Sequence, residues 1–219
     1  MSRKPLTPLP INWVRKSADS ARSGIDILPD GRLHCWIEHD IIRNVTPAML
    51  AWWFGHINGD VIVNGVAMNR YRVWHPCDHI LHEYLSRNPD GSVGVGCKMH
   101  IVEMLGRQPE HLVDIRAVIT KLDETGFGHH DSFLGLPLVC MNYHFDPVPE
   151  GTLYRNTLTI GFEGRIGRPF NRIVRSRVVH KTFGEAWIKH NIEEVGNFEF
   201  FLPALYASRR DQPQASINK

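Results

Sequence analysis

The segment FGEAWIKHNIEEVGNFEFF, residues 183–201, constrains the fold more than any other part of the chain. Read as a helix, residues three and four apart lie on one face. That face carries, in order, Phe183, Trp187, His190, Glu194, Phe198 and Phe201. Four of the six are large aromatic residues, so the face is predicted to be buried. A carboxylate in an apolar core costs several kcal/mol unless it is paired, and the rest of the chain must supply its partner.

The histidine and the glutamate on this face form a candidate metal-binding pair. His190 and Glu194 are four residues apart, about one helical turn, on the same side of the helix. Two such ligands can hold one metal ion, and zinc accepts both imidazole nitrogen and carboxylate oxygen. A solvated or salt-bridged pair is the common alternative and stays open, although the aromatic neighbours favour a metal. Glu193 lies off the stripe, and we expect it to be solvated.

Length and composition indicate an ordinary globular protein. The chain has 219 residues, of which 42% are hydrophobic and 22% charged, and a formal charge of +2. Because charges of both signs are mixed along the chain, nucleic acid and membrane surfaces are not expected partners. No apolar run reaches the length of a membrane span, and the N-terminus has no signal-peptide pattern. The four cysteines form no Cys-x-x-Cys pair, so we expect free thiols in the cytoplasm.

The order of predicted elements is that of an α+β fold. We expect an extended arm in residues 1–30, one domain in 31–208 and a disordered tail in 209–219. Strands are predicted within 33–42, 68–75, 97–105, 112–124, 136–148, 151–164 and 172–183, and a helical turn or tight loop at 78–85. A short helix follows Thr46 as N-cap and Pro47 at its first position. A curved antiparallel sheet around the terminal helix would enclose a cavity, where small-molecule sites are common.

A second polar cluster lies in YRVWHPCDHILHEY, residues 71–84. It contains His75, Asp78, His79 and His82. Because Pro76 ends the preceding predicted strand, the histidines lie where a strand becomes a loop, a usual position for functional residues. A carboxylate beside a histidine can orient the imidazole ring. For each histidine, the alternative of a solvated loop residue stays open.

Two glutamates are candidates for a further ligand. In the predicted strand KMHIVEML, Glu103 shares a largely apolar face with Ile101 and Leu105, so its carboxylate needs a partner. Glu110 lies in turn-like sequence and is expected to be exposed. His144 lies in another predicted strand, where it is either functional or a core histidine hydrogen-bonded to the backbone.

Four motifs, AWWFGHI, YRVWHPCDHI, HIVEML and HNIEEVGNFEFFLPALY, together resemble the diacetylphloroglucinol hydrolase and phloretin hydrolase family, from about residue 45 to residue 206. The resemblance implies a helix-grip, Bet v 1-like fold. It also implies hydrolysis of the carbon–carbon bond between an acyl group and a polyhydroxylated, phloroglucinol-type ring, so that the small-molecule partner is a phenolic ketone. Zn²⁺ would be held by two histidines and two glutamates, which by motif are His79, Glu103, His190 and Glu194.

The resemblance also assigns roles beyond the metal. It implies that Tyr71 and His82 lie near the ring hydroxyls and that His144 lies near the reacting acyl group. In the implied mechanism, hydroxide on the metal attacks the acyl carbonyl, His144 moves a proton and Tyr71 holds the charge that develops on the ring. An aromatic wall suited to a flat phenolic ring would comprise Trp52, Trp53, Trp187 and Phe198.

The chain departs from the family in two places, and two other functions stay open. Its N-terminal region is short, and the segment between His79 and Glu103 also looks shorter, which keeps Glu110 as a rival ligand. One alternative is a helix-grip protein that binds a hydrophobic small molecule without chemistry. The other is a mononuclear iron enzyme, which a second glutamate ligand disfavours because oxygen chemistry needs open positions. A homodimer is the working hypothesis for the assembly.

Overall fold

The computed structural model describes residues 4–165, 167–177 and 182–209. Its strands are β1 (Arg22–Ile27), β2 (Leu33–Glu38), β3 (Ile42–Arg43), β4 (Asp60–Val63), β5 (Val66–Asn69), β6 (His79–Tyr84), β7 (Lys98–Met104), β8 (Leu112–Asp123), β9 (Gly126–Phe133), β10 (Leu136–Val148) and β11 (Gly151–Ile160). Its α-helices are α1 (Pro47–Gly55), α2 (Arg70–Trp74), α3 (Arg168–Arg177) and α4 (Phe183–Ser208). Short 3₁₀ turns are η1 (Ala18–Ser20), η2 (Leu105–Arg107) and η3 (Pro109–His111).

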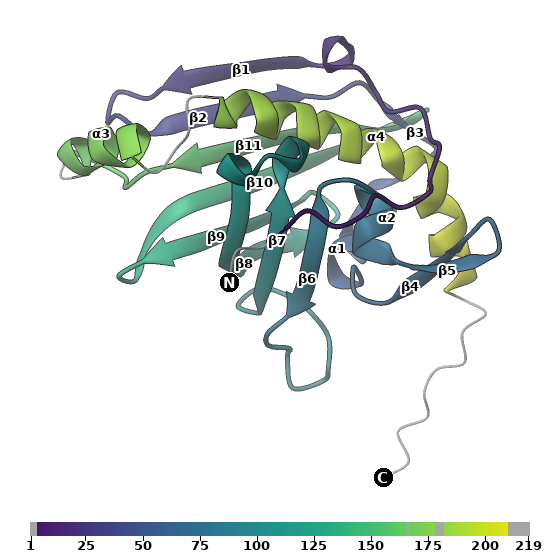
Figure 1. Cartoon of the computed structure of the whole chain (residues 1–219). Helices are drawn as coiled ribbons and strands as arrows, with labels where there is room; N and C mark the ends of the chain where they lie inside the picture. Colours follow the sequence, from purple (N-terminus) through teal and green to yellow (C-terminus); the bar gives the residue numbers. More distant parts are fainter. Residues whose placement is uncertain (1–3, 166, 178–181, 210–219) are drawn as a thin grey trace.

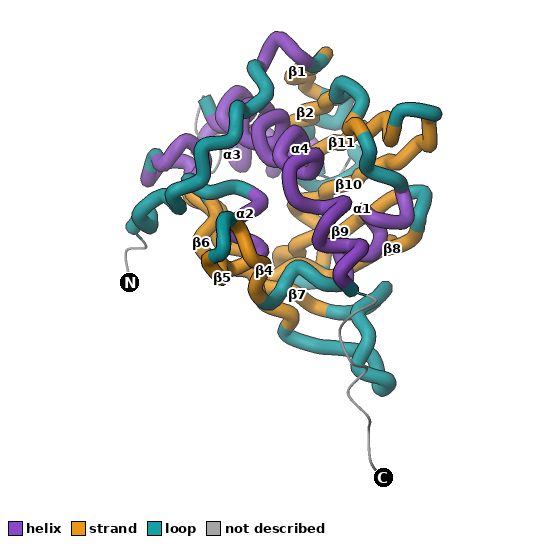
Figure 2. The backbone as a smooth tube through the Cα atoms, turned by 90° about the vertical axis from the view of Figure 1, so that its right-hand side faces the viewer, coloured by secondary structure: helices purple, strands orange, loops and turns teal. Residues whose placement is uncertain are grey.

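A nine-stranded antiparallel sheet curves around α4. The strand order is β1-β2-β11-β10-β9-β8-β7-β6, with β3 also paired to β11, while β4 and β5 form a separate hairpin. The long helix α4 crosses the concave side of the sheet, and α1 and α2 close one end (Figure 1). Figure 2 shows the same arrangement after a quarter turn. The predicted α+β class, a curved antiparallel sheet wrapped round a long C-terminal helix, is confirmed.

Local sequence explains several of these elements. The Thr46 side chain accepts a hydrogen bond from the backbone N–H of Met49 (3.3 Å), and Pro47 occupies the first position of α1, as predicted. In β11, every second residue is buried, which is the period of a strand with one face on the core. These buried residues are Thr152, Tyr154, Asn156, Leu158 and Ile160.

Three predicted elements are wrong. Residues 68–75 were expected to form a strand, but β5 ends at Asn69, whose side chain caps α2 by accepting from the N–H of Arg72 (3.1 Å). Residues 78–85, expected as a helical turn or loop, form strand β6. Residues 172–183 were expected to form a strand, but α3 extends to Arg177 and 178–181 lie outside the described residues. In each case the apolar run is too short for its period to separate helix from strand.

The sheet also contains strands that sequence patterning did not identify. β1 lies inside the expected arm and pairs with β2 from Arg22↔Glu38 to Ile27↔Leu33, so the sheet begins before residue 31. β9 contains glycines and histidines in place of the usual β-branched residues. Of the expected tail, 210–219 lies outside the described residues.

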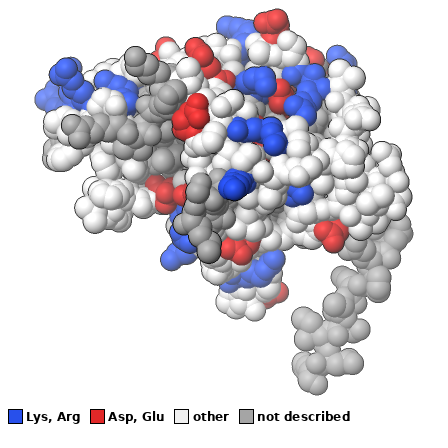
Figure 3. Space-filling model, in the orientation of Figure 1, with Lys and Arg blue, Asp and Glu red and all other residues white. Residues whose placement is uncertain are grey.

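The surface and the cysteines add little that is unusual. On the face drawn in Figure 3, positive and negative side chains are mixed across most of the surface. All four cysteines are free thiols, as expected. Within the described ranges, the helices are too short or too polar to cross a membrane.

Candidate metal centre and adjoining cavity

A β-bulge turns two histidines of β6 toward the inside of the sheet. His79 lies opposite Glu103 of β7, but the next pair is Leu81 with Val102, so one extra residue is inserted in β6. The bulge brings His82 opposite Ile101, on the same face as Glu103. Residues three apart in a regular strand would point to opposite faces. The bulge is therefore what directs both His79 and His82 inward.

The middle of α4 supplies two more candidate ligands, His190 and Glu194. His190 and Glu194 are 2% and 3% exposed and lie on the helix face that meets the sheet, as predicted. Nε2 of His79 lies 3.2 Å from Oε2 of Glu194 and 3.5 Å from Oε1 of Glu103. Nε2 of His190 lies 3.5 Å from Oε2 of Glu194 and 3.7 Å from Oε2 of Glu103.

These separations match the edges of a zinc coordination tetrahedron. With metal–ligand distances of about 2.0–2.2 Å, two ligand atoms of a tetrahedral site lie roughly 3.3–3.6 Å apart. Three of the four ligands predicted by resemblance, His79, His190 and Glu194, thus converge on one point. Glu103 lies beside them and directs one carboxylate oxygen at each histidine. The rival Glu110 is exposed in η3 and does not join them.

Hydrogen bonds to the far side of each ring set the tautomers of the two histidines. Nδ1 of His79 lies 2.6 Å from the carbonyl oxygen of Tyr71, which can only accept, so this nitrogen carries the proton. Nδ1 of His190 lies 3.0 Å from Oδ2 of Asp78, which likewise accepts. In the neutral rings, both Nε2 lone pairs then point toward the glutamates. Histidines that bind metals commonly donate their other ring N–H to a carbonyl or carboxylate in this way.

The convergence of buried acceptor atoms favours a positive charge at the site, carried by a proton or by a metal ion. Nε2 of His79, Nε2 of His190 and Oε2 of Glu194 are buried and have no hydrogen-bond partner among the described residues. Burial by itself lowers the pKa of His190, but the Glu194 carboxylate and the hydrogen bond with Asp78 raise it well above its ordinary value. Without a metal, the site therefore attracts a proton to His190. A divalent cation satisfies the same need, so the residues present fit zinc.

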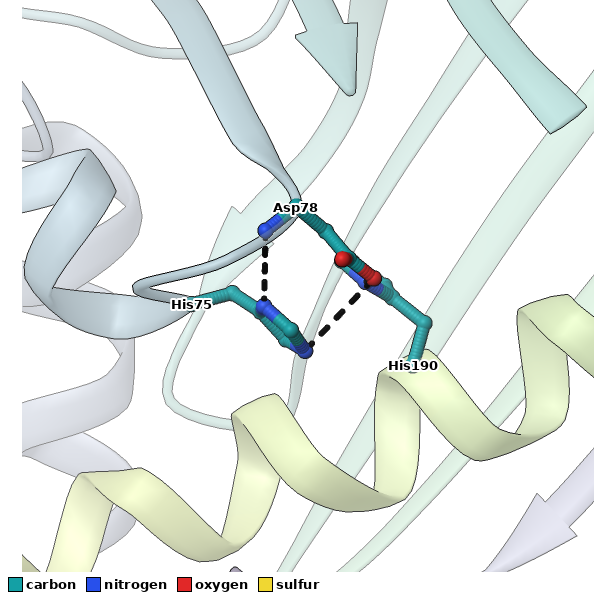
Figure 4. A group of neighbouring side chains, drawn as sticks. All are labelled: His75, Asp78 and His190. Carbon is teal, nitrogen blue, oxygen red and sulfur yellow. Dashed lines mark hydrogen bonds and ion pairs between the residues drawn. The ribbon is translucent and has the colours of Figure 1, made fainter. Parts of the chain in front are cut away.

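A neighbouring group orients the ligands and is satisfied without a metal. Figure 4 shows His75, Asp78 and His190 packed together beside α4. The N–H of Asp78 donates to Nδ1 of His75 (3.2 Å), so Nε2 of His75 carries the proton and donates to Glu193 (3.1 Å). The N–H of Gly106 donates to Oδ2 of Asp78 (2.8 Å). Although these three residues are close enough to bind an ion, hydrogen bonds already occupy the nitrogens of His75.

Tyr71, which was predicted to contact the substrate, also contacts two of the candidate metal ligands. Its hydroxyl donates a short hydrogen bond to Oε1 of Glu103, and its ring stacks on His79 with centroids 3.9 Å apart. Burial, reinforced by Glu103, raises the pKa of Tyr71 well above its ordinary value, so the hydroxyl stays protonated and can donate. Tyr71 thus holds two candidate ligands in place, while its side chain also borders the adjoining cavity.

The cavity lies beside the candidate metal centre and has a volume of about 270 Å³. It is mostly apolar, and both Glu103 and Glu194 reach its wall. Of the residues predicted to contact substrate, His82 and Trp187 also line it. Small-molecule sites have this character, an apolar wall with a few polar groups.

The tautomer of His82 is set by Asn58. The Asn58 amide nitrogen donates to the carbonyl of His82 (3.0 Å), so its oxygen faces Nδ1 of the ring (2.8 Å) and accepts from it. Nε2 of His82 is left as an acceptor without a partner among the described residues. Burial lowers the pKa of His82 to about 3, so the ring stays neutral at physiological pH.

Besides the exposed Asp114 at its edge, three polar residues of the cavity wall were not predicted from sequence. They are His129 on β9, Tyr143 on β10 and Asn191 on α4. His129 was missed because its strand was missed. Tyr143 is adjacent to His144, the residue predicted on β10. Strand alternation could have identified Tyr143, since Met141, Tyr143 and Phe145 are all buried. Asn191 lies between Trp187 and Glu194 on the predicted buried side of α4.

Two expectations about the surroundings of the site are wrong, namely the position of His144 and the composition of the aromatic wall. His144 is exposed, because it alternates with the buried Tyr143 on β10 and faces away from the cavity. Of the predicted aromatic wall, only Trp187 reaches the cavity; Trp53 packs on Phe198 behind it (5.8 Å between centroids). Trp52 stacks on His56 outside the cavity.

Glu193 was expected to be solvated, but its side chain is 12% exposed and ion-paired. Its partners are Arg15 (3.4 Å), Lys189 (3.0 Å) and His75 (3.1 Å). The middle of α4 is covered on more than one side, because the N-terminal arm lies against it opposite the sheet (Figure 1). A helix buried on several sides has no solvated face to receive an off-stripe residue.

The chain resembles known proteins in sequence and in fold. A family model described as DAPG hydrolase PhiG domain matches residues 11–127. No curated protein matches the sequence. The chain is similar to the crystal structure of Ara h 8.0201. The similarity covers 80% of this chain and 99% of Ara h 8.0201, with 14% sequence identity and a TM-score of 0.49. A START superfamily protein from Mycobacterium smegmatis is similar over 74% and 97%, with 11% identity and a TM-score of 0.42.

Proposed function

Because the chain belongs to the DAPG hydrolase family, whose model matches more than half of its length, we propose that it is a zinc-dependent hydrolase of phenolic ketones. The bond cleaved is the carbon–carbon bond between an acyl group and a polyhydroxylated aromatic ring of the acylphloroglucinol type. One observation supports a bound metal. Buried acceptor atoms of His79, His190 and Glu194 face one another with no hydrogen-bond partner among the described residues. Glu103 completes the set from β7.

Zinc fits this set of donors better than iron does. His79, His190, Glu103 and Glu194 would hold it, and two imidazoles with two carboxylates are donors that zinc accepts. A bound zinc ion lowers the pKa of a coordinated water toward about 7 and polarises a carbonyl oxygen. Four protein ligands would leave fewer open positions than oxygen chemistry at a mononuclear iron requires.

The cavity wall offers hydrogen-bonding groups that suit a hydroxylated ring. Nε2 of His82 can only accept a hydrogen bond, so it favours a ring hydroxyl over a ring carbonyl. Burial raises the pKa of Tyr143 well above its ordinary value, so its hydroxyl stays protonated and can donate to a ring oxygen. Trp187 and Phe127 supply aromatic surface. At about 270 Å³, the cavity suits one substituted ring with a short acyl group.

The reaction requires the departing ring to accept an electron pair. Water adds to the acyl carbonyl, the carbon–carbon bond breaks, and its electron pair moves to the ring. An aryl carbanion is a poor leaving group, but the keto tautomer of a polyhydroxylated ring departs as an enolate whose oxygens carry the charge. A protonated Tyr143 near a ring oxygen would stabilise that charge as it develops. The ring carbon gained its hydrogen when the ring ketonised, so the enolate oxygen takes up the last proton, and the products are a carboxylic acid and the deacylated ring.

A matched series of aryl ketones with two, one and no ortho hydroxyls tests this proposal. Acid release from the zinc-loaded protein should be fastest with two hydroxyls and absent with none, since only hydroxylated rings leave as enolates. Removing zinc with a chelator should abolish the release, and restoring zinc should recover it. Equal rates across the series would contradict the enolate step. Binding of the ketones without turnover, with zinc present, would support the alternative of a non-catalytic hydrophobic small-molecule-binding protein.

A further inference from the structure

The N-terminal arm contacts both elements that carry the candidate metal centre. Residues 4–17 run past β7, β6 and α2 and then along α4 before the chain enters β1 (Figure 1). The N–H of Leu9 donates to the carbonyl of Pro76 (3.2 Å), in the loop that precedes His79. Trp13 stacks on Phe200 of α4 with centroids 5.2 Å apart. The arm therefore spans the loop at 75–78 and the helix.

Arg15 joins these two elements directly. Nη1 of its guanidinium lies 3.4 Å from Oε2 of Glu193 on α4. Nη2 lies 2.9 Å from Sγ of Cys77, the residue before Asp78. One side chain thus bridges the helix that carries His190 to the loop that carries its hydrogen-bond acceptor.

The contacts continue inward from Glu193 to a candidate ligand. Glu193 accepts from Nε2 of His75 (3.1 Å), and the ring of His75 stacks on that of His190 with centroids 4.4 Å apart and planes at 19°. The other nitrogen of His75 accepts from the backbone N–H of Asp78, and the side-chain carboxylate of Asp78 accepts from His190. A shift of Glu193 or of the loop would therefore move the groups that fix the ring of His190.

The arm lies close against α4 at Gly196. A Cβ added at Gly196 would lie 2.7 Å from Cγ of Lys16, closer than side-chain atoms approach. Nζ of Lys16 also pairs with Glu199 of α4 (3.0 Å). Arg15 is therefore held between two residues, Trp13 and Lys16, that pack or pair with the helix.

We propose that Arg15 is a positioning residue of the metal centre, a tie from the N-terminal arm that fixes the loop at 75–78 against α4 and so sets how tightly zinc is held. The inference rests on the proposed function, because it assumes that zinc is bound. Lys189 contacts the same carboxylate of Glu193 at 3.0 Å but belongs to α4 itself. Lys189 neutralises Glu193 without joining two elements, which makes it a matched control.

The test compares zinc binding by Arg15→Met and Lys189→Met. Zinc affinity is measured by competition with a chromogenic chelator, and the rate of zinc loss is measured in excess chelator. Substitutions behind a ligand typically weaken metal binding by about 10- to 100-fold, and we expect about 10-fold weaker binding and faster loss for Arg15→Met. Lys189→Met should stay within about twofold of wild type, because the bridge is intact.

Two further variants separate positioning from general destabilisation. Arg15→Lys keeps the charge but not the two-pronged guanidinium, so an intermediate loss of affinity is expected. Arg15→Met combined with Glu193→Gln should be no worse than the more affected single variant, because both break one bridge. Thermal unfolding of the metal-free proteins reports fold stability separately from zinc loss.

The outcomes distinguish this proposal from the function on which it rests. If the wild-type protein takes up no zinc, both the proposed metal centre and the proposed role of Arg15 are wrong. If wild type and Arg15→Met bind zinc with equal affinity, only the proposed role of Arg15 is wrong. Equal losses in Arg15→Met and Lys189→Met would also overturn it, since charge on Glu193 would then explain the effect.

Discussion

Nε2 of His79 lies 3.2 Å from Oε2 of Glu194, and neither atom has a hydrogen-bond partner among the described residues. Nδ1–H of His79 donates to the backbone carbonyl of Tyr71, so in the neutral ring the lone pair of Nε2 faces that of the carboxylate oxygen. Such a contact is repulsive in a buried site unless a cation, either a proton or the proposed zinc ion, lies between the atoms. The predictions below depend on that cation and on the groups that orient its ligands.

His190→Ala is expected to lose zinc and activity together, because it removes one ligand and leaves three. Zinc content by elemental analysis and acid release from an ortho-hydroxylated ketone measure the two effects. His144→Ala is the control, since this histidine is exposed and faces away from the cavity. A His190→Ala protein that keeps a full equivalent of zinc would refute the ligand set.

Glu103→Gln should abolish metal-dependent activity, while Glu110→Gln should be close to neutral. Glu103 lies 3.5 Å from His79 and 3.7 Å from His190, whereas Glu110 is exposed in η3. The same two assays apply, on the same day and at equal protein concentration. The reverse result would mean that the third ligand comes from the segment after β7.

Asp78→Asn should weaken zinc binding by about 10- to 100-fold, because the carboxylate that orients His190 would become a neutral amide. The Nδ1 of His190 lies 3.0 Å from this carboxylate, which is buried. Asp40→Asn is a suitable control, since the Asp40 side chain is half exposed and, among the described residues, forms an ion pair with Lys16 of the arm (3.7 Å), away from the candidate metal centre. Chelator competition measures both, and equal affinities would count against the role of Asp78.

Asn58→Ala should raise KM with little change in bound zinc. The amide of Asn58 holds the proton of His82 on Nδ1, which leaves Nε2 free to accept from a ring hydroxyl. Without Asn58, the ring can rotate or change tautomer, and loss of one hydrogen bond of about 1.4 kcal/mol corresponds to about tenfold. Steady-state kinetics with the ortho-dihydroxy ketone measure the change. An unchanged KM would place the ring hydroxyls elsewhere in the cavity.

His39→Gln should make the protein less sensitive to acid. Burial lowers the pKa of His39 to about 4, against about 6.5 in an unfolded chain. Between these values the unfolded state binds the extra proton, so wild type loses stability as pH falls from about 6.5. From pH 7 to pH 5 that loss is about 2 kcal/mol for one histidine. Glutamine does not titrate, so the stability difference between the two proteins should shrink by about that amount.

Urea unfolding at the two pH values, followed by tryptophan fluorescence, measures this difference. Both proteins contain the same remaining buried histidines, so their contributions cancel in the comparison. A stability difference that is the same at pH 7 and pH 5 would show that His39 is protonated in the folded state as well.

Short-range patterns in the sequence identified the features that depend on few residues. The stripe of α4 follows from helical periodicity, and the start of α1 follows from Thr46 and Pro47. The preference for Glu103 over Glu110 follows from strand alternation beside apolar residues. Each of these needs only a window of some ten residues, because neighbouring side chains on one face must share one environment.

Other features depend on contacts between distant segments, which no local window contains. The bulge that turns His79 and His82 to one face arises from pairing with β7, and the wrong assignment of residues 78–85 as a turn has the same origin. His129 faces the cavity because β9 pairs with β8 and β10, although its sequence is unlike that of a strand. Burial of Glu193 depends on Arg15 and on an arm that crosses α4 from the far end of the chain. The sequence therefore determined which residues could bind a metal, while packing between remote segments decided their orientation, because orientation is set by partners that only folding brings into contact.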